Sequence, residues 1–249
     1  MFTFIFLCLG GFLAAFVDSI AGGGGLISMP VLLIVGLPTH LALGTNKFAG
    51  ACGCFTSAYR YSKSGKTNIE LLKKLIPFTI LGCILGVKCV LSISDTLLNI
   101  LVFVMILVVA VYTYTKKDLG AENKFEELTS KNIRLGMVMA FSLGFYDGFF
   151  GPGTGTFLAF ALIKIYGFDF LHACANTKIL NFTSNFTALI LFMFSGQILY
   201  KVAIFYALSM MLGGYVGAKV AVKKGSKLIK PIFLIMAFCV AIKLIYQML

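Results

Sequence analysis

The chain has 249 residues, of which 59% are hydrophobic and only 12% are charged. Soluble globular domains carry about 25% charged residues, so this composition excludes a water-soluble fold and indicates a membrane protein with several spanning segments. The formal charge of +12 does not indicate nucleic acid binding. The lysines lie mostly in loops beside apolar segments, where they fix orientation and contact anionic lipid.

The N-terminal apolar run, residues 2–17, has the length of a signal peptide but not its other features. It lacks a preceding basic region, and Asp18 lies where cleavage would fall. A related pattern recurs near residue 147. We therefore expect this run to belong to the mature protein and to form the first membrane segment.

Ten apolar segments follow one another along the chain, and in lipid they must be helices because no water is available to satisfy the backbone. Two of them, residues 26–37 and 157–166, are too short to cross a hydrocarbon core of about 30 Å. We expect these two to be half-helices or re-entrant segments. The eight longer segments are residues 2–17, 41–59, 75–91, 97–114, 135–150, 170–194, 198–222 and 232–249.

The second half of the chain repeats the first. Gly36 aligns with Gly167, and the same offset of 131 residues aligns Lys47 with Lys178. Upstream of Gly36 the offset is 129. Matched pairs at the two offsets include Gly82/Gly213, Gly86/Gly217, Asp18/Asp147, Gly22/Gly151 and Gly24/Gly153. We therefore predict a first transmembrane repeat over residues 1–115, a charged cytoplasmic linker over 116–134 and a second transmembrane repeat over 135–249.

Basic residues change sides between the two halves. The loop after residues 41–59 is rich in them, whereas its counterpart around Gly196 has only Lys201. The turn at residues 92–96 has no lysine, whereas its counterpart is rich in them. The basic residues of the two rich loops are Arg60, Lys63, Lys66, Lys73 and Lys74, and Lys223, Lys224, Lys227 and Lys230. Because basic loops stay in the cytoplasm, the halves should have opposite orientations, with both termini in the periplasm.

The fold predicted is thus an all-α polytopic membrane protein. It has two inverted-topology repeats, each with a broken or re-entrant hairpin plus three spanning helices.

Two acids lie at membrane depth, Asp18 and Asp147. A carboxylate in an apolar run costs a few kcal/mol, so it should face the bundle interior or water. It could carry a proton, bind a cation or act as a gate. Alternatively, it could be structural and accept hydrogen bonds from free backbone N–H groups at the hairpin turn.

Glycine clusters follow both acids, and they permit positive φ and close backbone approach. A broken helix exposes N–H groups, so two half-helix N-termini meeting near the midplane would favour an anionic substrate. Tight helix packing is the alternative role, and it suits the pairs spaced four apart, such as Gly82/Gly86, better than the clusters. The clusters are Gly22, Gly23, Gly24 and Gly25, and Gly151, Gly153 and Gly155 with Pro152.

Polar groups occur inside the next long segment of each half. Their hydroxyl, amide and ammonium donors suit the oxygens of an oxyanion, and inside lipid they need such partners. Snorkelling to the membrane surface is the alternative for Lys47, which lies about two turns into its helix. The candidate residues are Thr45, Asn46 and Lys47, and Asn176, Thr177, Lys178 and Asn181.

The seven cysteines all fall in apolar segments and are expected to be small packing residues. Cys52 and Cys54 are two apart and so lie on different helix faces, and His40 and His172 have no ligand cluster near them. The chain has no HExxH, GxSxG or Walker A motif. We therefore expect no metal, no cofactor, no enzymatic activity and no ATP drive within this chain.

Residues 21–50, AGGGGLISMPVLLIVGLPTHLALGTNKFAG, resemble the first-half motif of the sulfite exporter TauE/SafE family. Residues 144–160, GFYDGFFGPGTGTFLAF, and 175–185, ANTKILNFTSN, resemble the second-half motif. The resemblance covers nearly the whole chain. It implies a bacterial inner-membrane permease linked to sulfite and small organosulfonates, in which the acids, glycines and polar groups named above are the functional residues.

The expected function is secondary transport of a small anion, with export of sulfite or an organosulfonate as the favoured hypothesis. Asp18 and Asp147 would gate, carry a coupled proton or brace the hairpins. The alternatives are a cation, proton-coupled or metal permease that uses the two aspartates, and a non-transport membrane assembly factor. The expected partners are the small anion and the lipid bilayer, with no nucleic acid, and the sequence leaves the oligomeric state open.

Overall fold

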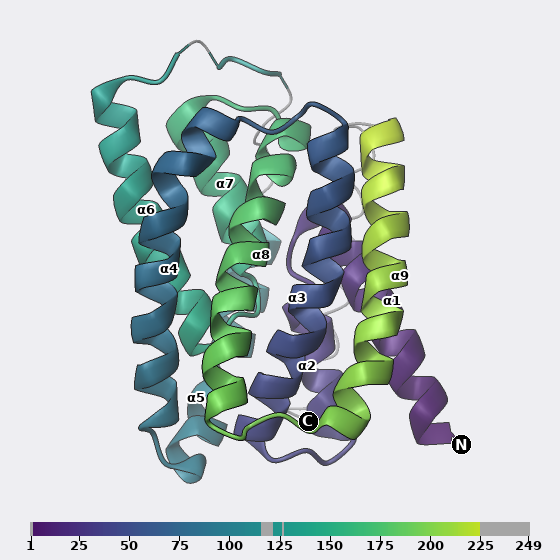
Figure 1. The fold of residues 1–249 in the computed structure, drawn as a ribbon. Helices are drawn as coiled ribbons and strands as arrows, with labels where there is room; N and C mark the ends of the chain where they lie inside the picture. The colour runs from purple at the N-terminus through teal and green to yellow at the C-terminus, as the bar shows by residue number, and fades with distance from the viewer. Residues whose placement is uncertain (1, 116–121, 126, 225–249) are drawn as a thin grey trace.

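In the computed structural model, described over residues 2–115, 122–125 and 127–224, the chain is all-helical (Figure 1). The helices of this part are α1 (Phe2–Ala21), α2 (Gly25–Ile34), α3 (Thr39–Lys63), α4 (Ile69–Leu91), α5 (Asp95–Thr115), α6 (Ser130–Phe149), α7 (Thr154–Tyr166), α8 (Phe170–Phe194) and α9 (Tyr200–Lys224). The predicted segment at 232–249 lies outside the described residues, as do residues 116–121 and 126 of the linker, Lys227 and Lys230 of the second basic loop, and Cys239.

Within the described residues, three helices are both long and apolar enough to cross a membrane: Thr3–Ala21, Ile69–Leu91 and Tyr200–Lys223. The central helices α3 and α8 are 25 residues each but carry the polar groups noted above. These properties are those of a helical membrane protein.

Two helices begin earlier than their apolar runs. At α4, the side chain of Asn68 accepts a hydrogen bond from the Leu71 N–H and so caps the helix before its charged first turn. At α6, Thr129 caps the Asn132 N–H in the same way, so the C-terminal end of the predicted linker is helical. Hydrophobicity alone does not predict the first turns of these helices because their side chains are polar. The hydrogen-bonded cap stabilises these turns, so each helix begins before its apolar run.

Glycines with positive φ interrupt the helices where the sequence predicts a break. Gly22 and Gly23, with φ of 74° and 83°, separate α1 from α2. Gly151 and Gly153, with φ of 97° and 87°, separate α6 from α7. Residues with a Cβ rarely adopt this conformation, so the chain reverses at these positions and leaves α2 and α7 as short helices.

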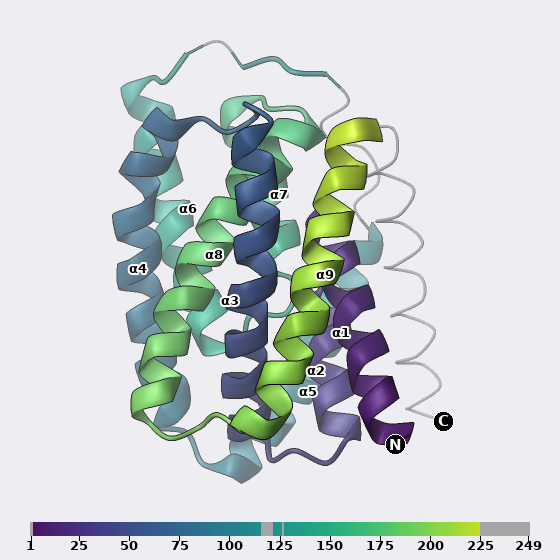
Figure 2. The same ribbon diagram turned by 45° about the vertical axis from the view of Figure 1, so that its right-hand side comes forward.

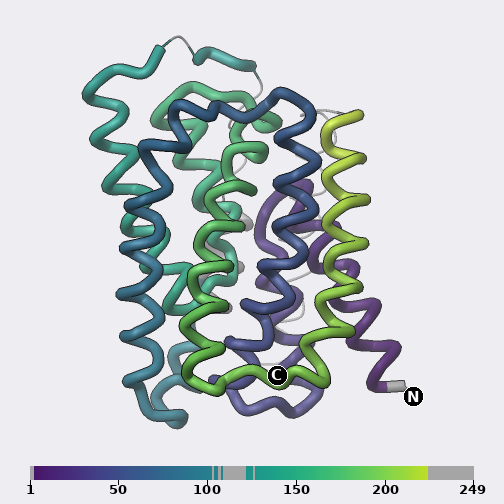
Figure 3. Tube along the Cα trace, viewed as in Figure 1, coloured from purple at the N-terminus to yellow at the C-terminus, as the bar shows by residue number. Residues whose placement is uncertain are grey.

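The helices form a bundle in which α1 and α9 make one side and α4 and α6 the other, with α3 and α8 between them (Figures 1 and 2). The α1–α2 hairpin opens toward the end that carries the N-terminus, and the α6–α7 hairpin opens toward the opposite end (Figure 3). Helices α3 and α8 run in opposite directions, as do α4 and α9. Each short helix is surrounded by its own cluster of buried apolar side chains, which include Met29 for α2 and Leu162 for α7.

Small residues let the outer helix pairs approach closely. Four glycine–carbonyl contacts of these pairs are Gly82 with Phe141, Gly86 with Phe145, Gly213 with Phe12 and Gly217 with Phe16. A Cβ atom added at any of these glycines would lie within 2.3 Å of the facing oxygen. The α4–α6 contacts map onto the α9–α1 contacts by the offsets of 131 and 129, so equivalent residues make equivalent contacts, always between the two halves.

Candidate functional site

The two glycine breaks touch each other at the centre of the bundle. A Cβ atom added at Gly22 would lie 2.5 Å from the carbonyl carbon of Gly155, and one added at Gly25 would lie 2.7 Å from the Cα atom of Pro152. The start of α2 and the start of α7 therefore come together, although about 130 residues separate them in the sequence. Within the described residues, neither start has a side-chain cap.

A cavity of about 40 Å³ lies where the breaks meet, which is room for about three water molecules. Most of the sequence-predicted site residues line it. They are Asp18, Gly23, Gly24, Gly25, Asn46, Lys47, Asp147, Gly151, Gly153, Gly155 and Asn181. Gly22, Thr45, Asn176, Thr177 and Lys178 lie outside its lining.

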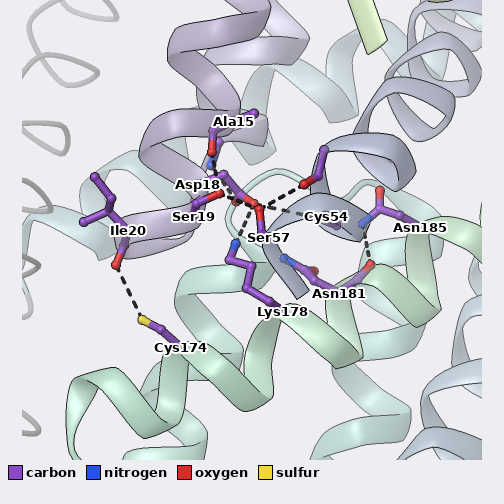
Figure 4. Close-up of polar contacts among 12 residues, drawn as sticks. Ala15, Asp18, Ser19, Ile20, Cys54, Ser57, Cys174, Lys178, Asn181 and Asn185 are labelled. Atoms are coloured by element: carbon purple, nitrogen blue, oxygen red, sulfur yellow. Dashed lines mark hydrogen bonds and ion pairs between the residues drawn. The ribbon is translucent and has the colours of Figure 1, made fainter. Parts of the chain in front are cut away.

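The acids and lysines form two buried ion pairs that cross between the halves. The Lys178 Nζ lies 2.5 Å from the Asp18 Oδ2, as Figure 4 shows. The Lys47 Nζ lies 3.1 Å from the Asp147 Oδ1 and also donates to the main-chain oxygen of Asp147 at 2.5 Å. Both lysine side chains are at most 2% exposed, so neither snorkels to a membrane surface.

Each acid has a further partner from its own half. The Gly24 N–H donates to the Asp18 Oδ1 at 3.1 Å, and the Cys54 thiol lies 3.8 Å from the Asp18 Oδ2 (Figure 4). The Asn185 amide donates to the Asp147 Oδ2 at 3.5 Å. Asp18 thus has both a backbone N–H at the hairpin turn, as in the structural alternative, and an ammonium partner.

Two side chains of the cavity lining have unpaired polar atoms. Within the described residues, the side-chain oxygens of Asn46 and Asn181, which line the cavity, and of Thr156 and Thr177, which do not, are buried without a hydrogen-bond partner. Because an amide can exchange its oxygen and nitrogen by turning over, Asn46 and Asn181 can each present either group to a guest. A buried polar atom without a partner is costly, so a guest with complementary groups would be stabilised here.

Thr45 and Asn176 make contacts of another kind. The Thr45 hydroxyl accepts from the Leu199 N–H at 3.1 Å, and the Asn176 carbonyl oxygen accepts from the Asn68 N–H at 2.8 Å. These pairs are related by the offset of 131, and each satisfies a backbone group just before a helix of the other half. The observed role of Thr45 and Asn176 is to accept these backbone hydrogen bonds. Their part in substrate binding stays a prediction.

Sequence reasoning missed several cavity residues, chiefly Gly50 and Cys54. Cys54 was expected to be a packing residue, whereas Asn185, which also lines the cavity, belongs to the polar residues that extend the predicted second group. The offset of 131 places Cys54 opposite Asn185 and Gly50 opposite Asn181. That equivalence was the available signal. No group of three His, Cys, Asp or Glu side chains that could hold a metal occurs among the described residues.

Comparison with known proteins identifies the family. A family model described as "Sulfite exporter TauE/SafE" matches residues 7–244. The chain belongs to the sulfite exporter TauE/SafE family. A Haemophilus influenzae relative named "Probable membrane transporter protein" is 37% identical over 98% of this chain and 94% of its own length. The "Probable membrane transporter protein YfcA" of Escherichia coli K12 is 31% identical over 94% of this chain and 87% of its own length. No solved structure matches the chain.

Proposed function

We propose that this protein is a secondary transporter that moves a small oxyanion, of the sulfite or short organosulfonate class, out of the cytoplasm. Membership of a membrane transporter family supports transport itself. The class of substrate rests on the central cavity and on the groups that line it.

The observation that carries the proposal is the meeting of two helix N-termini, with glycine at each N-cap, at a cavity with two buried lysines beside it. Helix N-termini present N–H groups and a partial positive charge, and lysine adds a full one. Asn46 and Asn181 add amide groups whose side chains have unpaired atoms. Three kinds of donor therefore converge on one small space, as recognition of an oxyanion requires.

The size of the cavity favours the smaller members of this class. Room for about three water molecules suits a sulfite ion, with four heavy atoms, better than a longer sulfonate. A longer sulfonate would need the site to open. We expect the same residues to serve both, because they would hold the sulfur-bound oxygens in either case.

We further propose that the halves are inverted-topology repeats in a bacterial inner membrane, with the basic ends of α3 and α9 in the cytoplasm. The opposite directions of equivalent helices and the matching glycine contacts support this arrangement. Exposed charges support the orientation, because Lys63 and Lys223 lie at the same end of the bundle, away from the N-terminus.

Uptake of labelled sulfite into proteoliposomes tests the proposal. Asn181→Ala should raise the Kd for sulfite about 10- to 100-fold, because a hydrogen bond to a charged group contributes about 1.5–3 kcal/mol. Asn123→Ala, which changes an exposed amide in the linker, should leave transport at the wild-type rate. Equal uptake by empty vesicles and by vesicles with wild-type protein would refute anion transport.

A cation permease is the second candidate, because the carboxylates of Asp18 and Asp147 line the cavity. Both carboxylates already have an ammonium partner, which leaves less negative charge for a cation. Transport that is inhibited by Na⁺ or a divalent metal in the absence of sulfite would favour a cation permease over an anion transporter. The inhibition should then be lost in the Asp18→Asn and Asp147→Asn variants.

A further inference from the structure

The two crossed ion pairs are equivalent in sequence but differ in their surroundings. Asp147 is 3% exposed, and Lys47 holds both its carboxylate and its main-chain oxygen. The side chain of Asp18 is 16% exposed, and Lys178 reaches it through the Oδ2 atom. Both Asp147 and Lys47 line the cavity, but their pair is almost fully buried and anchored to the backbone, whereas the Asp18 carboxylate is more exposed.

Only the acid of this pair lines the cavity. Asp18 is part of the lining, whereas Lys178, which pairs with it (Figure 4), lies outside the lining. An anion that enters the cavity therefore meets a carboxylate before it meets the Lys178 ammonium. Like charges at such short range repel strongly in a site of low dielectric, so the ionised form of Asp18 obstructs an anion.

A proton on Asp18 would remove this obstruction. The neighbours of Asp18 are the Lys178 ammonium from α8, the Cys54 thiol from α3, the Gly24 N–H at the start of α2 and the Gly155 backbone from α7. The second pair, Lys47 with Asp147, also lines the cavity and is balanced in charge. Once Asp18 is neutral, Lys178 is the ammonium left without an anionic partner.

We propose that Asp18, and not its equivalent Asp147, is the acid that carries the coupled proton. When Asp18 is protonated, Lys178 no longer pairs with its carboxylate and pairs with the bound anion instead. This inference rests on the proposed anion transport. The proton comes from water and binds the Asp18 carboxylate. The Asp18–Lys178 ion pair breaks, Lys178 keeps its own proton, and the anion takes the place of the carboxylate charge.

The exchange keeps the charge of the site constant. Before it, the Asp18 and Lys178 charges cancel, and after it the anion and Lys178 cancel while Asp18 is neutral. A buried site avoids an unpaired charge, because desolvation makes such a charge costly. One proton therefore accompanies each monovalent anion, and the combined movement carries no net charge across the membrane.

Purified protein in detergent allows a test by calorimetric titration with methanesulfonate, a monovalent anion that does not itself titrate near neutral pH. Wild-type Kd should rise about tenfold per pH unit over the alkaline range, since one proton is linked to binding. Asp18→Asn mimics the neutral acid, so its Kd should be independent of pH and lower than the wild-type Kd at about pH 8.5. Asp147→Asn, the matched control, should retain the wild-type pH slope.

Proton uptake gives a second measurement if Asp147→Asn does not fold. In weakly buffered solution with an indicator dye, wild type should take up about one proton per methanesulfonate bound, and Asp18→Asn none. Wild-type binding without a pH slope and without proton uptake would overturn the inference, as would a pH slope retained in Asp18→Asn. If wild type binds neither methanesulfonate nor sulfite at any pH, the proposed anion transport itself fails.

Discussion

Four ionisable side chains, three of them buried and Asp18 partly exposed, join the two halves of the chain at its centre. Asp18 pairs with Lys178 of the second half, and Lys47 pairs with Asp147 in the reciprocal way. Burying two charges costs several kcal/mol per ion, and only close pairing recovers that cost. We infer that both pairs hold the halves in this closed arrangement and that opening one of them is tied to substrate entry.

The pairing predicts a particular pattern of stabilities. Asp18→Ala and Lys178→Ala should each lower the free energy of unfolding by about 3–5 kcal/mol, because each leaves one buried charge without its partner. Asp18→Ala/Lys178→Ala should lower it by less than the sum of the two, because no lone charge remains. Denaturant unfolding in detergent measures all three. If the double variant lost as much free energy of unfolding as the two single variants together, Asp18 and Lys178 would not interact in solution.

The partners in these pairs could not be predicted from the sequence, although the residues could. Each half holds one acid and one lysine, and the spacing favours neither a pair within a half nor one between halves. The choice is made by tertiary packing. Helices α3 and α8, which carry the two lysines, pack against each other, and the hairpin breaks that follow the two acids are in contact. Cys54 was missed for a related reason, because a thiol in an apolar helix looks like a packing residue until its neighbour Asp18 is known.

At the scale of elements, glycine patterns were the most informative feature of the sequence. Consecutive glycines predicted the break after α1, and the structure has positive φ at Gly22 and Gly23. Glycines four apart predicted close packing, and Gly82 and Gly86 lie against the α6 backbone. The helix starts at Ile69 and Ser130 were placed less well, because polar caps and not apolar runs determine them.

Close helix contact makes Gly86 sensitive to a single added methyl group. In Gly86→Ala the new Cβ would lie 2.1 Å from the Phe145 oxygen, so α4 and α6 must separate. We expect a loss of about 1–3 kcal/mol in the free energy of unfolding. Gly217→Ala should cost a similar amount at the equivalent α9–α1 contact, where the Cβ–oxygen distance would be 2.3 Å.

The control for these glycine variants is Leu81→Ala, at a side chain that is 54% exposed on the outer surface of α4. It removes more atoms but creates no clash, so its unfolding free energy should remain within about 0.5 kcal/mol of the wild type. If Gly86→Ala were as stable as this control, the two helices would not be in backbone contact in the membrane.

At the scale of the whole molecule, charge is distributed unevenly between the two ends of the bundle. The α3–α4 connection follows Arg60 and Lys63, whereas the α4–α5 connection at the opposite end leads into Asp95, the first residue of α5. Basic residues remain on the cytoplasmic side, so the first connection should lie inside the cell and the second outside. The N-terminus lies at the same end as the α4–α5 connection, which places it outside as well (Figure 3).

Cysteine labelling in intact cells measures this orientation directly. In a variant whose native cysteines are replaced, Ser62→Cys and Ser94→Cys introduce exposed thiols at the two opposite ends of the bundle. A membrane-impermeant maleimide should label the cysteine at position 94 in intact cells and the one at position 62 only after the membrane is opened. The reverse labelling pattern would show that the protein has the opposite orientation, with its basic ends outside the cell. Sulfite export driven toward the N-terminal end would then become import, while the central cavity and its ion pairs would keep the same chemistry.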